Sequence, residues 1–211
     1  MIIIVSKFNN IYDLVVEGSD LTYKPVPLPY AFNALEPFID KETMELHYNK
    51  HYKGYIKKLN DEISGSTPII QVVENIKKYS DKVRNNAGGY YNHTLFWSYM
   101  TPGATAPSDE LVKAIGSKFT SLKNFKEKFI ESALSVFGSG WCWVVKKNNK
   151  LEFVHTPNQD NPLMTKQGKP ILGVDVWEHA YYKKYGPDRE KYLENFYEVI
   201  NWDVVSNHFI S

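Results

Sequence analysis

The sequence predicts an α+β protein in which a helical N-terminal lobe precedes an α+β C-terminal lobe. Between residues 40 and 100, apolar residues recur every three or four positions, which is the spacing of amphipathic helices. Residues 101–110 (TPGATAPSDE) contain two prolines, a glycine and no large apolar residue, so they mark the best boundary between the lobes. Around residues 141–153 the apolar spacing changes to two, which is the period of a β-strand.

In the N-terminal lobe, the residues after Asp40 are expected to form one long helix with Asp40 as its N-cap. A second helical region covers residues 69–100 and is broken or bent around Ser80. Before both regions, three prolines within residues 25–29 exclude a helix. The predicted inward-facing stripe of the first helix is formed by Met44, His47, His51, Tyr55 and Leu59.

The C-terminal lobe combines helices with short strands. Amphipathic helices are expected at residues 111–119 and 122–133. Alternating apolar residues on either side of residues 147–150 predict a β-hairpin with its turn at that point. The remaining predicted elements are a short strand at residues 171–176 and helices at residues 177–185 and 189–209.

These patterns divide the 211 residues into three parts. Residues 1–22 form an N-terminal extension for which no structure is predicted, residues 23–104 the helical domain, and residues 105–211 the α+β domain. The chain has 15 Tyr, 11 Phe and 5 Trp. Each such side chain buries about 150–250 Å², so this length can support a sizeable core.

Charge and cysteine content exclude several classes of function. With 25 basic and 24 acidic residues the formal charge is +1, which argues against nucleic acid or an anionic membrane surface as a partner. The single cysteine, Cys142, rules out an intramolecular disulfide framework and a cysteine-rich zinc or iron–sulfur site. The six histidines are therefore the main candidate metal ligands.

The sequence indicates a cytoplasmic protein without a membrane segment. No apolar run approaches the roughly 18–20 residues of a membrane span. The apolar run from Met1 to Val5 is shorter than the roughly 7–15 residues of a secretion-signal core, and no basic region precedes it. Glu17, Asp20 and the absence of arginine in this region argue against a mitochondrial transit peptide.

Two histidines of the N-terminal lobe are candidate ligands. His47 lies on the inward face of the first helix, where a buried imidazole is either a packing residue with a hydrogen-bond partner or a metal ligand. His93 follows the pair Gly88 and Gly89, and each glycine costs about 1 kcal/mol relative to alanine inside a helix. The glycines indicate that something approaches the backbone closely, either at a site or in helix–helix contact.

The sharpest signal for a site is the segment ILGVDVWEHAYY at residues 171–182. Asp175 ends a predicted strand and His179 follows in the first turn of a predicted helix, so both side chains can point at one position. A carboxylate and an imidazole make a metal-binding pair. In the alternative, Asp175 only caps the helix and His179 lies on its surface; the apolar residues around them disfavour a solvated face.

Three histidines and one aspartate would form a ligand set of three nitrogens and one oxygen. Zinc would accept it with tetrahedral geometry, and five-coordinate manganese or iron with one solvent molecule would accept it equally. The ligand set alone does not choose between these metals. The other candidates, His155 and His208, are expected to be structural or exposed, and Cys142 to be an inert apolar residue.

From about Tyr23 to Phe209 the chain resembles the iron/manganese superoxide dismutases. The most specific match is DVWEHAYY at residues 175–182. One departure is the pair His51 and Tyr52, where many members carry two histidines; it removes no ligand. The other matching segments are LPYAFNALEP (28–37), ETMELHYNKHYKGY (42–55), NNAGGYYNHTLFW (85–97), FGSGWCW (137–143) and NQDNPL (158–163).

The resemblance implies a helical hairpin domain, then an α/β domain with a three-stranded antiparallel sheet, in a homodimer or tetramer with one ion per subunit. It implies that the metal ligands are His47, His93, Asp175 and His179. It places Tyr55 and His51 beside the substrate channel and Arg189 near its mouth, and it lines a dry pocket with Trp97, Trp141 and Trp143. It also implies that Glu178 reaches the partner subunit's His179 and that Tyr182 reaches the partner subunit's His51.

The position of one glutamine bears on the metal. In manganese-type members, the glutamine that bonds the metal-bound solvent lies in a C-terminal motif like NQD. In iron-type members it lies four residues before the second ligand histidine. Here Gly89 occupies the helix position and Gln159 the C-terminal one, so the resemblance implies manganese. Iron is the alternative cofactor, because some members work with either metal.

The activity implied is disproportionation of superoxide to dioxygen and hydrogen peroxide by alternate reduction and oxidation of the ion, with Gln159 tuning the potential and Tyr55 supplying protons. Because the net charge is near neutral, attraction of the anion must be local, with Lys50 and Arg189 as candidate contributors. One rival is a zinc hydrolase, which would need an open coordination position and a general base. The other is a non-enzymatic metal-binding homologue.

Overall fold

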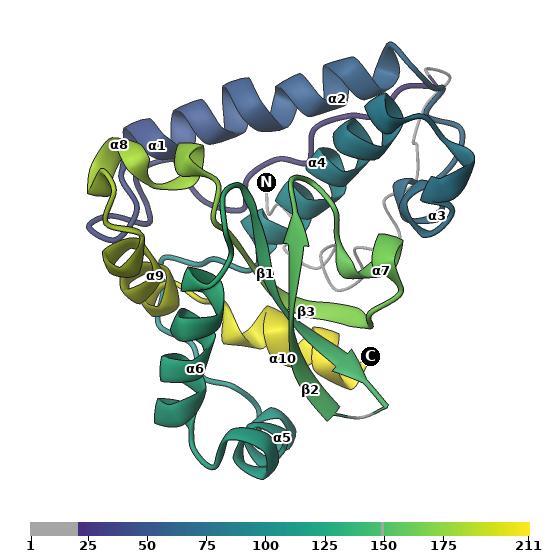
Figure 1. Cartoon of the computed structure of the whole chain (residues 1–211). Helices are drawn as coiled ribbons and strands as arrows, with labels where there is room; N and C mark the ends of the chain where they lie inside the picture. The colour runs from purple at the N-terminus through teal and green to yellow at the C-terminus, as the bar shows by residue number, and fades with distance from the viewer. Residues whose placement is uncertain (1–20, 149) are drawn as a thin grey trace, which may run out of the picture.

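The computed structural model describes residues 21–148 and 150–211 of the chain, so nearly all of the predicted extension (residues 1–22) lies outside the described residues. Helices come first along the chain and a three-stranded sheet follows (Figure 1). The elements are α1 (Lys41–Leu46), η3 (His47–Tyr52), α2 (Lys53–Asn60), α3 (Ile69–Glu74), η4 (Ile76–Lys78), α4 (Asp81–Ser98), α5 (Asp109–Phe119), α6 (Leu122–Leu134), β1 (Gly140–Lys147), β2 (Lys150–Pro157), α7 (Pro162–Thr165), β3 (Lys169–Asp175), η5 (Glu178–Ala180), α8 (Tyr182–Tyr185), α9 (Arg189–Glu198) and α10 (Trp202–Ile210).

The long helix predicted after Asp40 begins at the expected residue, because Asp40 Oδ1 accepts a hydrogen bond from the Thr43 backbone N–H at 2.9 Å. Its middle is not regular α-helix. Between α1 and α2 the chain makes the π-helical stretch η3, which carries His47 and His51. Apolar periodicity does not predict such a wider turn, and π-helical turns are frequent at functional sites.

The second helical region is interrupted where predicted. It consists of α3, the short η4 and α4, and Ser80 begins α4 by accepting a hydrogen bond from the Val83 N–H at 3.3 Å. Residues 87–97 of α4 are buried without interruption. Helix α2 packs against α4 (Figure 1), and α3, η3 and β3 also contact α4, so several elements together cover this stretch.

The sheet has the order β2-β1-β3 and is antiparallel throughout, which confirms the expected fold class. Lys147 pairs with Lys150, so the hairpin turn lies at the predicted residues. Burial along β1 does not alternate. Cys142 and Val144 are buried as well as Trp141 and Trp143, because β1 is the central strand and both of its faces are covered.

The C-terminal residues form two helices, α9 and α10, where one continuous pattern was predicted at residues 189–209. The chain breaks between them to pair with residues that follow α4. Met100 and Ile200 form an antiparallel bridge, the Thr101 N–H donates to the Val199 carbonyl at 2.8 Å, and the Asn201 N–H donates to the Tyr99 carbonyl at 2.8 Å. This long-range pairing has no counterpart in the local sequence.

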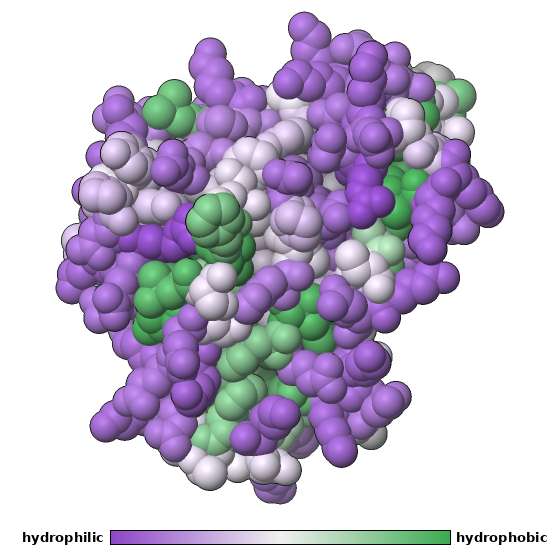
Figure 2. All heavy atoms as spheres, in the orientation of Figure 1, coloured by the Kyte–Doolittle hydropathy of each residue, from purple (hydrophilic) through white to green (hydrophobic). Residues whose placement is uncertain are grey.

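The surface is largely hydrophilic on the face drawn in Figure 2, with hydrophobic patches mainly toward its centre. None of the described helices is both long and apolar enough to cross a membrane. Aromatic rings dominate the largest fully buried side chains, as the composition predicted.

Candidate metal centre

His47 is the first residue of the π-helical stretch and lies on the inward face of the first helix. Only 1% of its surface is exposed. Its Nε2 lies 3.1 Å from Oδ2 of Asp175, a carboxylate 128 positions away in the chain, and this contact alone fits both alternatives left open by the sequence. Two further imidazoles that approach the same oxygen favour the metal ligand.

His93 comes from the buried part of α4 and is oriented by its own helix. Its Nδ1 lies 2.7 Å from the Gly89 carbonyl, an acceptor, so Nδ1 carries the proton and the Nε2 lone pair is free. A Cβ at Gly89 would lie 2.4 Å from the Tyr55 ring, and one at Gly88 would lie 2.0 Å from the Gln159 carbonyl oxygen. The two glycines therefore admit two close neighbours beside this ligand.

Asp175 and His179 come from the end of β3 and the short helix η5. Asp175 is not the N-cap of η5, because that position is occupied by Trp177, so the capping alternative is wrong. Its Oδ1 accepts the Trp177 backbone N–H at 2.9 Å, which holds the strand-to-helix turn, and its Oδ2 lies 3.2 Å from His179 Nε2. The Tyr192 hydroxyl donates to the Asp175 carbonyl at 2.9 Å and fixes the backbone from behind.

These four side chains converge on one point. One donor atom from each of His47, His93, Asp175 and His179 lies within 4.8 Å of the others. The three Nε2 atoms lie 3.1, 3.5 and 3.2 Å from Asp175 Oδ2, and His93 Nε2 is buried without a hydrogen-bond partner. Two ligands on one ion with bonds of about 2.1 Å lie about 3.0–3.4 Å apart at angles near 90–110°. The donor set therefore fits one metal ion.

The protonation states of the cluster favour a cation. Burial lowers the pKa of His47 well below its usual value and also lowers the pKa of His93. Burial alone would raise the pKa of Asp175, but the electrostatic effect of the neighbouring His179 and hydrogen bonds from the imidazoles hold that pKa well below its usual range. Neutral His47 and His93 and an ionised Asp175 are in the forms that bind metal.

Aromatic rings surround the cluster. Trp97 lies edge-on to His47 with ring centres 4.9 Å apart, and Trp141 lies edge-on to His93 at 5.3 Å. Trp143 stacks on Trp141 at 5.2 Å, one ring farther out. All three tryptophans are at most 2% exposed, so they restrict water around the ligands.

Gln159 and Tyr55 form a hydrogen-bonded pair beside His93. The Gln159 amide Nε2 donates to the Tyr55 hydroxyl oxygen at 3.1 Å, and Gln159 Oε1 accepts from the Trp141 indole N–H at 3.1 Å. The Tyr55 ring centre lies 5.3 Å from that of His93. Burial, opposed by the bond from Gln159, raises the pKa of Tyr55 to about 12, so Tyr55 is protonated at neutral pH.

The other predicted site residues lie nearer the surface. The half-buried His51 ring stacks on His179 with centres 4.0 Å apart, and burial lowers its pKa to about 4. Glu178 is exposed and Tyr182 is 51% exposed in the single chain. Arg189 donates to the Val136 and Gly138 carbonyls and to the Tyr181 hydroxyl, so its guanidinium holds a loop. Lys50 is exposed.

Sequence reasoning missed Asn92, which is fully buried next to His93. Its amide donates to the Gln159 carbonyl at 3.0 Å and accepts from Asn161 at 3.0 Å. The signal available in the sequence was a polar residue within a stretch too apolar to face water. Away from the centre, Cys142 is buried and burial raises the pKa of its thiol to about 12, so the thiol is protonated at neutral pH.

Comparisons with known proteins agree with the centre. Residues 22–101 match the model of the iron/manganese superoxide dismutase α-hairpin domain, and residues 107–208 match the model of the family's C-terminal domain. A protein from Acinetobacter baylyi named superoxide dismutase (Mn) is 49% identical over 198 residues, covering 89% of this chain and 87% of that protein. A Listeria innocua protein of the same name is 48% identical over 200 residues, covering 90% and 98%.

An α-hairpin domain, a C-terminal domain with an antiparallel sheet and one buried centre of three histidines and an aspartate define a redox metalloenzyme. The chain belongs to the iron/manganese superoxide dismutase family. Its activity is the disproportionation of superoxide to dioxygen and hydrogen peroxide, and His47, His93, Asp175 and His179 form its manganese or iron site.

Proposed function

We propose how the residues around the centre share this reaction. The observation that carries the proposal is the convergence of four donor atoms from largely buried residues, with His93 Nε2 lacking a hydrogen-bond partner among the described residues. The bound ion supplies the one-electron chemistry that amino-acid side chains lack. The remaining tasks are to exclude bulk water, to admit a small anion and to provide protons.

Tyr55 and Gln159 provide the proton-donating group. The Tyr55 oxygen accepts the hydrogen bond from the Gln159 amide, so the Tyr55 O–H is free to donate to an incoming anion. The amide cannot turn over without losing the bond that Gln159 Oε1 accepts from Trp141. Gln159 thereby sets the polarity of the pocket and tunes the potential of the ion.

His51 and Lys50 act at the approach to the pocket. His51 stacks on the outer ligand His179 and borders the way in. Its lowered pKa of about 4 keeps it neutral at physiological pH, so it shapes the path without adding charge. The exposed Lys50 contributes local attraction for superoxide on a protein of formal charge +1.

The working assembly is a homodimer, or a tetramer built from it, with Glu178 and Tyr182 at the interface. Both are exposed in the single chain although they flank a metal ligand, and Phe137 is fully exposed at 102%. We expect Phe137→Asp to sediment as a monomer in analytical ultracentrifugation where the unmodified protein sediments as a dimer or larger.

Two further expectations stay predictions of the sequence. They are the domain limits at residues 23–104 and 105–211, and a cytoplasmic location.

Elemental analysis of the purified protein, combined with an assay of superoxide consumption, tests the function directly. We expect one manganese ion per chain and activity that is lost on metal removal and restored by manganese. Reconstitution with iron measures use of the second metal. Stoichiometric zinc with no superoxide consumption would contradict the assignment and favour the zinc-hydrolase alternative. Among the described residues, tyrosine, glutamine and tryptophan side chains pack beside the ligands, whereas Glu178, the carboxylate that precedes His179, is exposed. The pocket therefore does not provide the zinc-hydrolase alternative with a buried carboxylate base.

Gln159→Asn tests the tuning role. The shorter side chain cannot keep the bonds to both Tyr55 and Trp141, so we expect kcat to fall about 10- to 100-fold and the reduction potential of the bound manganese to move. Gln167→Asn makes the same chemical change at an exposed position and is the control. An unchanged potential and unchanged activity in Gln159→Asn would remove Gln159 from the mechanism.

A further inference from the structure

Three residues of α4, each one turn from the next, contact the loop that carries Gln159. Arg84, Gly88 and Asn92 stand at i, i+4 and i+8, so they share one face of the helix. That face lies against residues 159–160. The loop at residues 159–160 therefore packs against α4, the helix that carries the ligand His93.

Arg84 holds this loop by a paired ionic contact. Its Nε donates to Asp160 Oδ1 at 2.7 Å, and its Nη2 donates to Asp160 Oδ2 at 2.6 Å. The two side chains are 36% and 15% exposed. Two parallel charged hydrogen bonds fix orientation as well as distance, which a single contact does not.

Gly88 and Asn92 complete the contact on the Gln159 side. A Cβ at Gly88 would lie 2.0 Å from the Gln159 carbonyl oxygen, so the loop backbone rests directly on the helix. Asn92 Nδ2 donates to that carbonyl at 3.0 Å and also lies 3.3 Å from Gln159 Oε1. Just before Gln159, Asn158 has a φ of 51°, in the left-handed region that asparagine adopts more readily than most residues other than glycine.

We propose that Arg84 is a positioning residue for the metal centre, acting through Asp160 on the placement of the Gln159 amide. Asp160 is the next residue in the chain, so a movement of its backbone moves the Gln159 peptide with it. The Gln159 amide lies 3.1 Å from the Tyr55 oxygen, and small displacements of a placed group are costly in an active site. The proposal rests on the role proposed above for Gln159.

Arg84→Gln and Asp160→Asn each break the ion pair and test the proposal. The matched control is Lys82→Gln, which removes the same charge two residues earlier in α4 and breaks an exposed pair with Glu62, 3.4 Å long. The readouts are the reduction potential of the bound manganese, the visible spectrum of the oxidised protein and the dissociation constant of azide, with metal content and thermal unfolding measured in parallel.

We expect both variants to bind one manganese ion, to move the potential and spectrum in the same direction as Gln159→Asn, and to weaken or strengthen azide binding by about 10-fold. Arg84→Lys keeps the charge but cannot make two parallel hydrogen bonds to the carboxylate. Its potential, spectrum and azide affinity should therefore lie between those of the wild-type protein and those of Arg84→Gln. In the Gln159→Asn background, Arg84→Gln should add little, because both changes act through one amide.

A lower unfolding temperature with wild-type potential, spectrum and azide affinity would overturn the proposal and leave the ion pair a structural feature only. The same holds if Lys82→Gln has equal effects. If Arg84→Gln does not fold, Asp160→Asn and Arg84→Lys decide by the same readouts. A Gln159→Asn protein with unchanged potential and spectrum would instead refute the role of Gln159 itself, so the two failures are distinguishable.

Discussion

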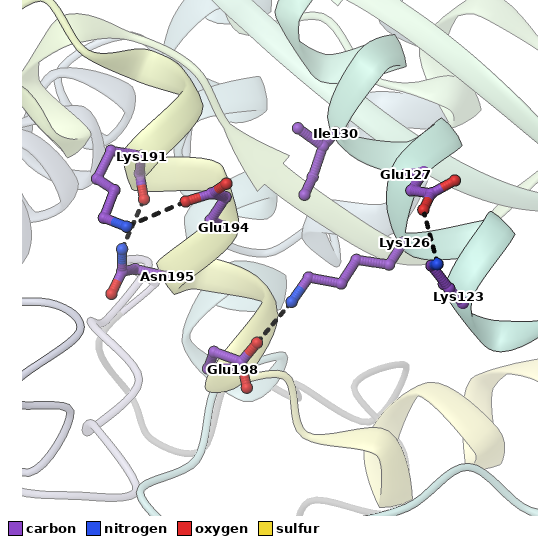
Figure 3. Close-up of a pocket in the computed structure, with 8 residues that line it drawn as sticks. All are labelled: Lys123, Lys126, Glu127, Ile130, Lys191, Glu194, Asn195 and Glu198. Carbon is purple, nitrogen blue, oxygen red and sulfur yellow. Dashed lines mark hydrogen bonds and ion pairs between the residues drawn. The ribbon is translucent and has the colours of Figure 1, made fainter.

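Two groups of charged side chains lie in opposite environments in this molecule. At the metal centre, Asp175 is completely buried and faces three imidazoles. In the open groove between α6 and α9, lysines and glutamates pair in water, as Lys126 with Glu198 at 2.6 Å and Lys191 with Glu194 at 3.2 Å (Figure 3). The groove pairs are satisfied within the chain, whereas His93 Nε2 at the centre has no partner.

The difference shows that burial, more than residue type, separates a functional charge cluster from a surface one. Burial makes each polar group costly unless a partner is present, and at the centre the missing partner is the metal ion. In the groove, solvent screens every pair, so the loss of one has little effect. Four changes test this contrast, beginning with the largest expected effect.

Asp175→Asn removes the only carboxylate of the four-residue cluster while keeping its shape. We expect metal affinity to fall at least 100-fold, because loss of an outer partner of a ligand already costs about 10- to 100-fold. Competition with a chelator, with elemental analysis after dialysis, measures the loss. Asp203→Asn at an exposed site on α10 is the control, and full manganese retention in Asp175→Asn would contradict the assignment of this ligand.

His208 is a buried imidazole far along the chain from the ligands. Burial, with the nearby Lys169, lowers its pKa to about 4. The unfolded chain binds a proton near pH 6.5 that the folded chain does not bind until about pH 4, so acid favours unfolding. Above about pH 6.5 the titration of His208 does not lower the free energy of unfolding. As the pH falls from there to about 4, the free energy of unfolding decreases by on the order of 3 kcal/mol.

Urea denaturation of the wild-type protein and of His208→Gln between pH 4 and pH 7 measures this contribution. The difference in stability between the two should shrink toward low pH. A difference that stays constant over this range would contradict the lowered pKa.

Tyr192→Phe removes the hydroxyl that donates to the Asp175 carbonyl at 2.9 Å. The acceptor is left buried without this donor, so we expect the free energy of unfolding to fall by about 1–3 kcal/mol. Thermal unfolding monitored by circular dichroism gives the value. Tyr197→Phe on the same helix, at a partly exposed ring, is the control and should cost less.

Lys126→Ala breaks the Lys126–Glu198 pair of the groove and should have the smallest effect. Its side chain is 34% exposed and that of Glu198 is 48% exposed, so we expect a change in unfolding free energy below about 1 kcal/mol and unchanged superoxide consumption. Repeating the denaturation at high salt should reduce even this difference. A loss comparable to that of Tyr192→Phe would show that solvent exposure does not separate the two regions.

Much of this site could be predicted from the sequence because its signals are local. Asp175 and His179 lie four residues apart at a predicted strand-to-helix junction. Gly88 and Gly89, just before His93, predict that another group approaches the helix backbone closely. The π-helical stretch at residues 47–52 was not predicted, because a wider turn leaves the apolar spacing almost unchanged. Nor was the contact of Arg84 with Asp160, 76 positions apart, since each residue alone is an ordinary surface charge.

The sequence by itself determined the fold class, the N-cap at Asp40 and the interruption at Ser80, because caps and apolar periods act over a few residues. The four ligands followed from the resemblance of its motifs to a known family. Only the tertiary structure decided that both faces of β1 are covered, that residues 199–201 pair beside α4, and that Gln159 meets Tyr55. These contacts join residues that are far apart in the chain; Tyr55 and Gln159 are separated by 104 positions. Their formation depends on the packing of the whole core, which no local pattern contains.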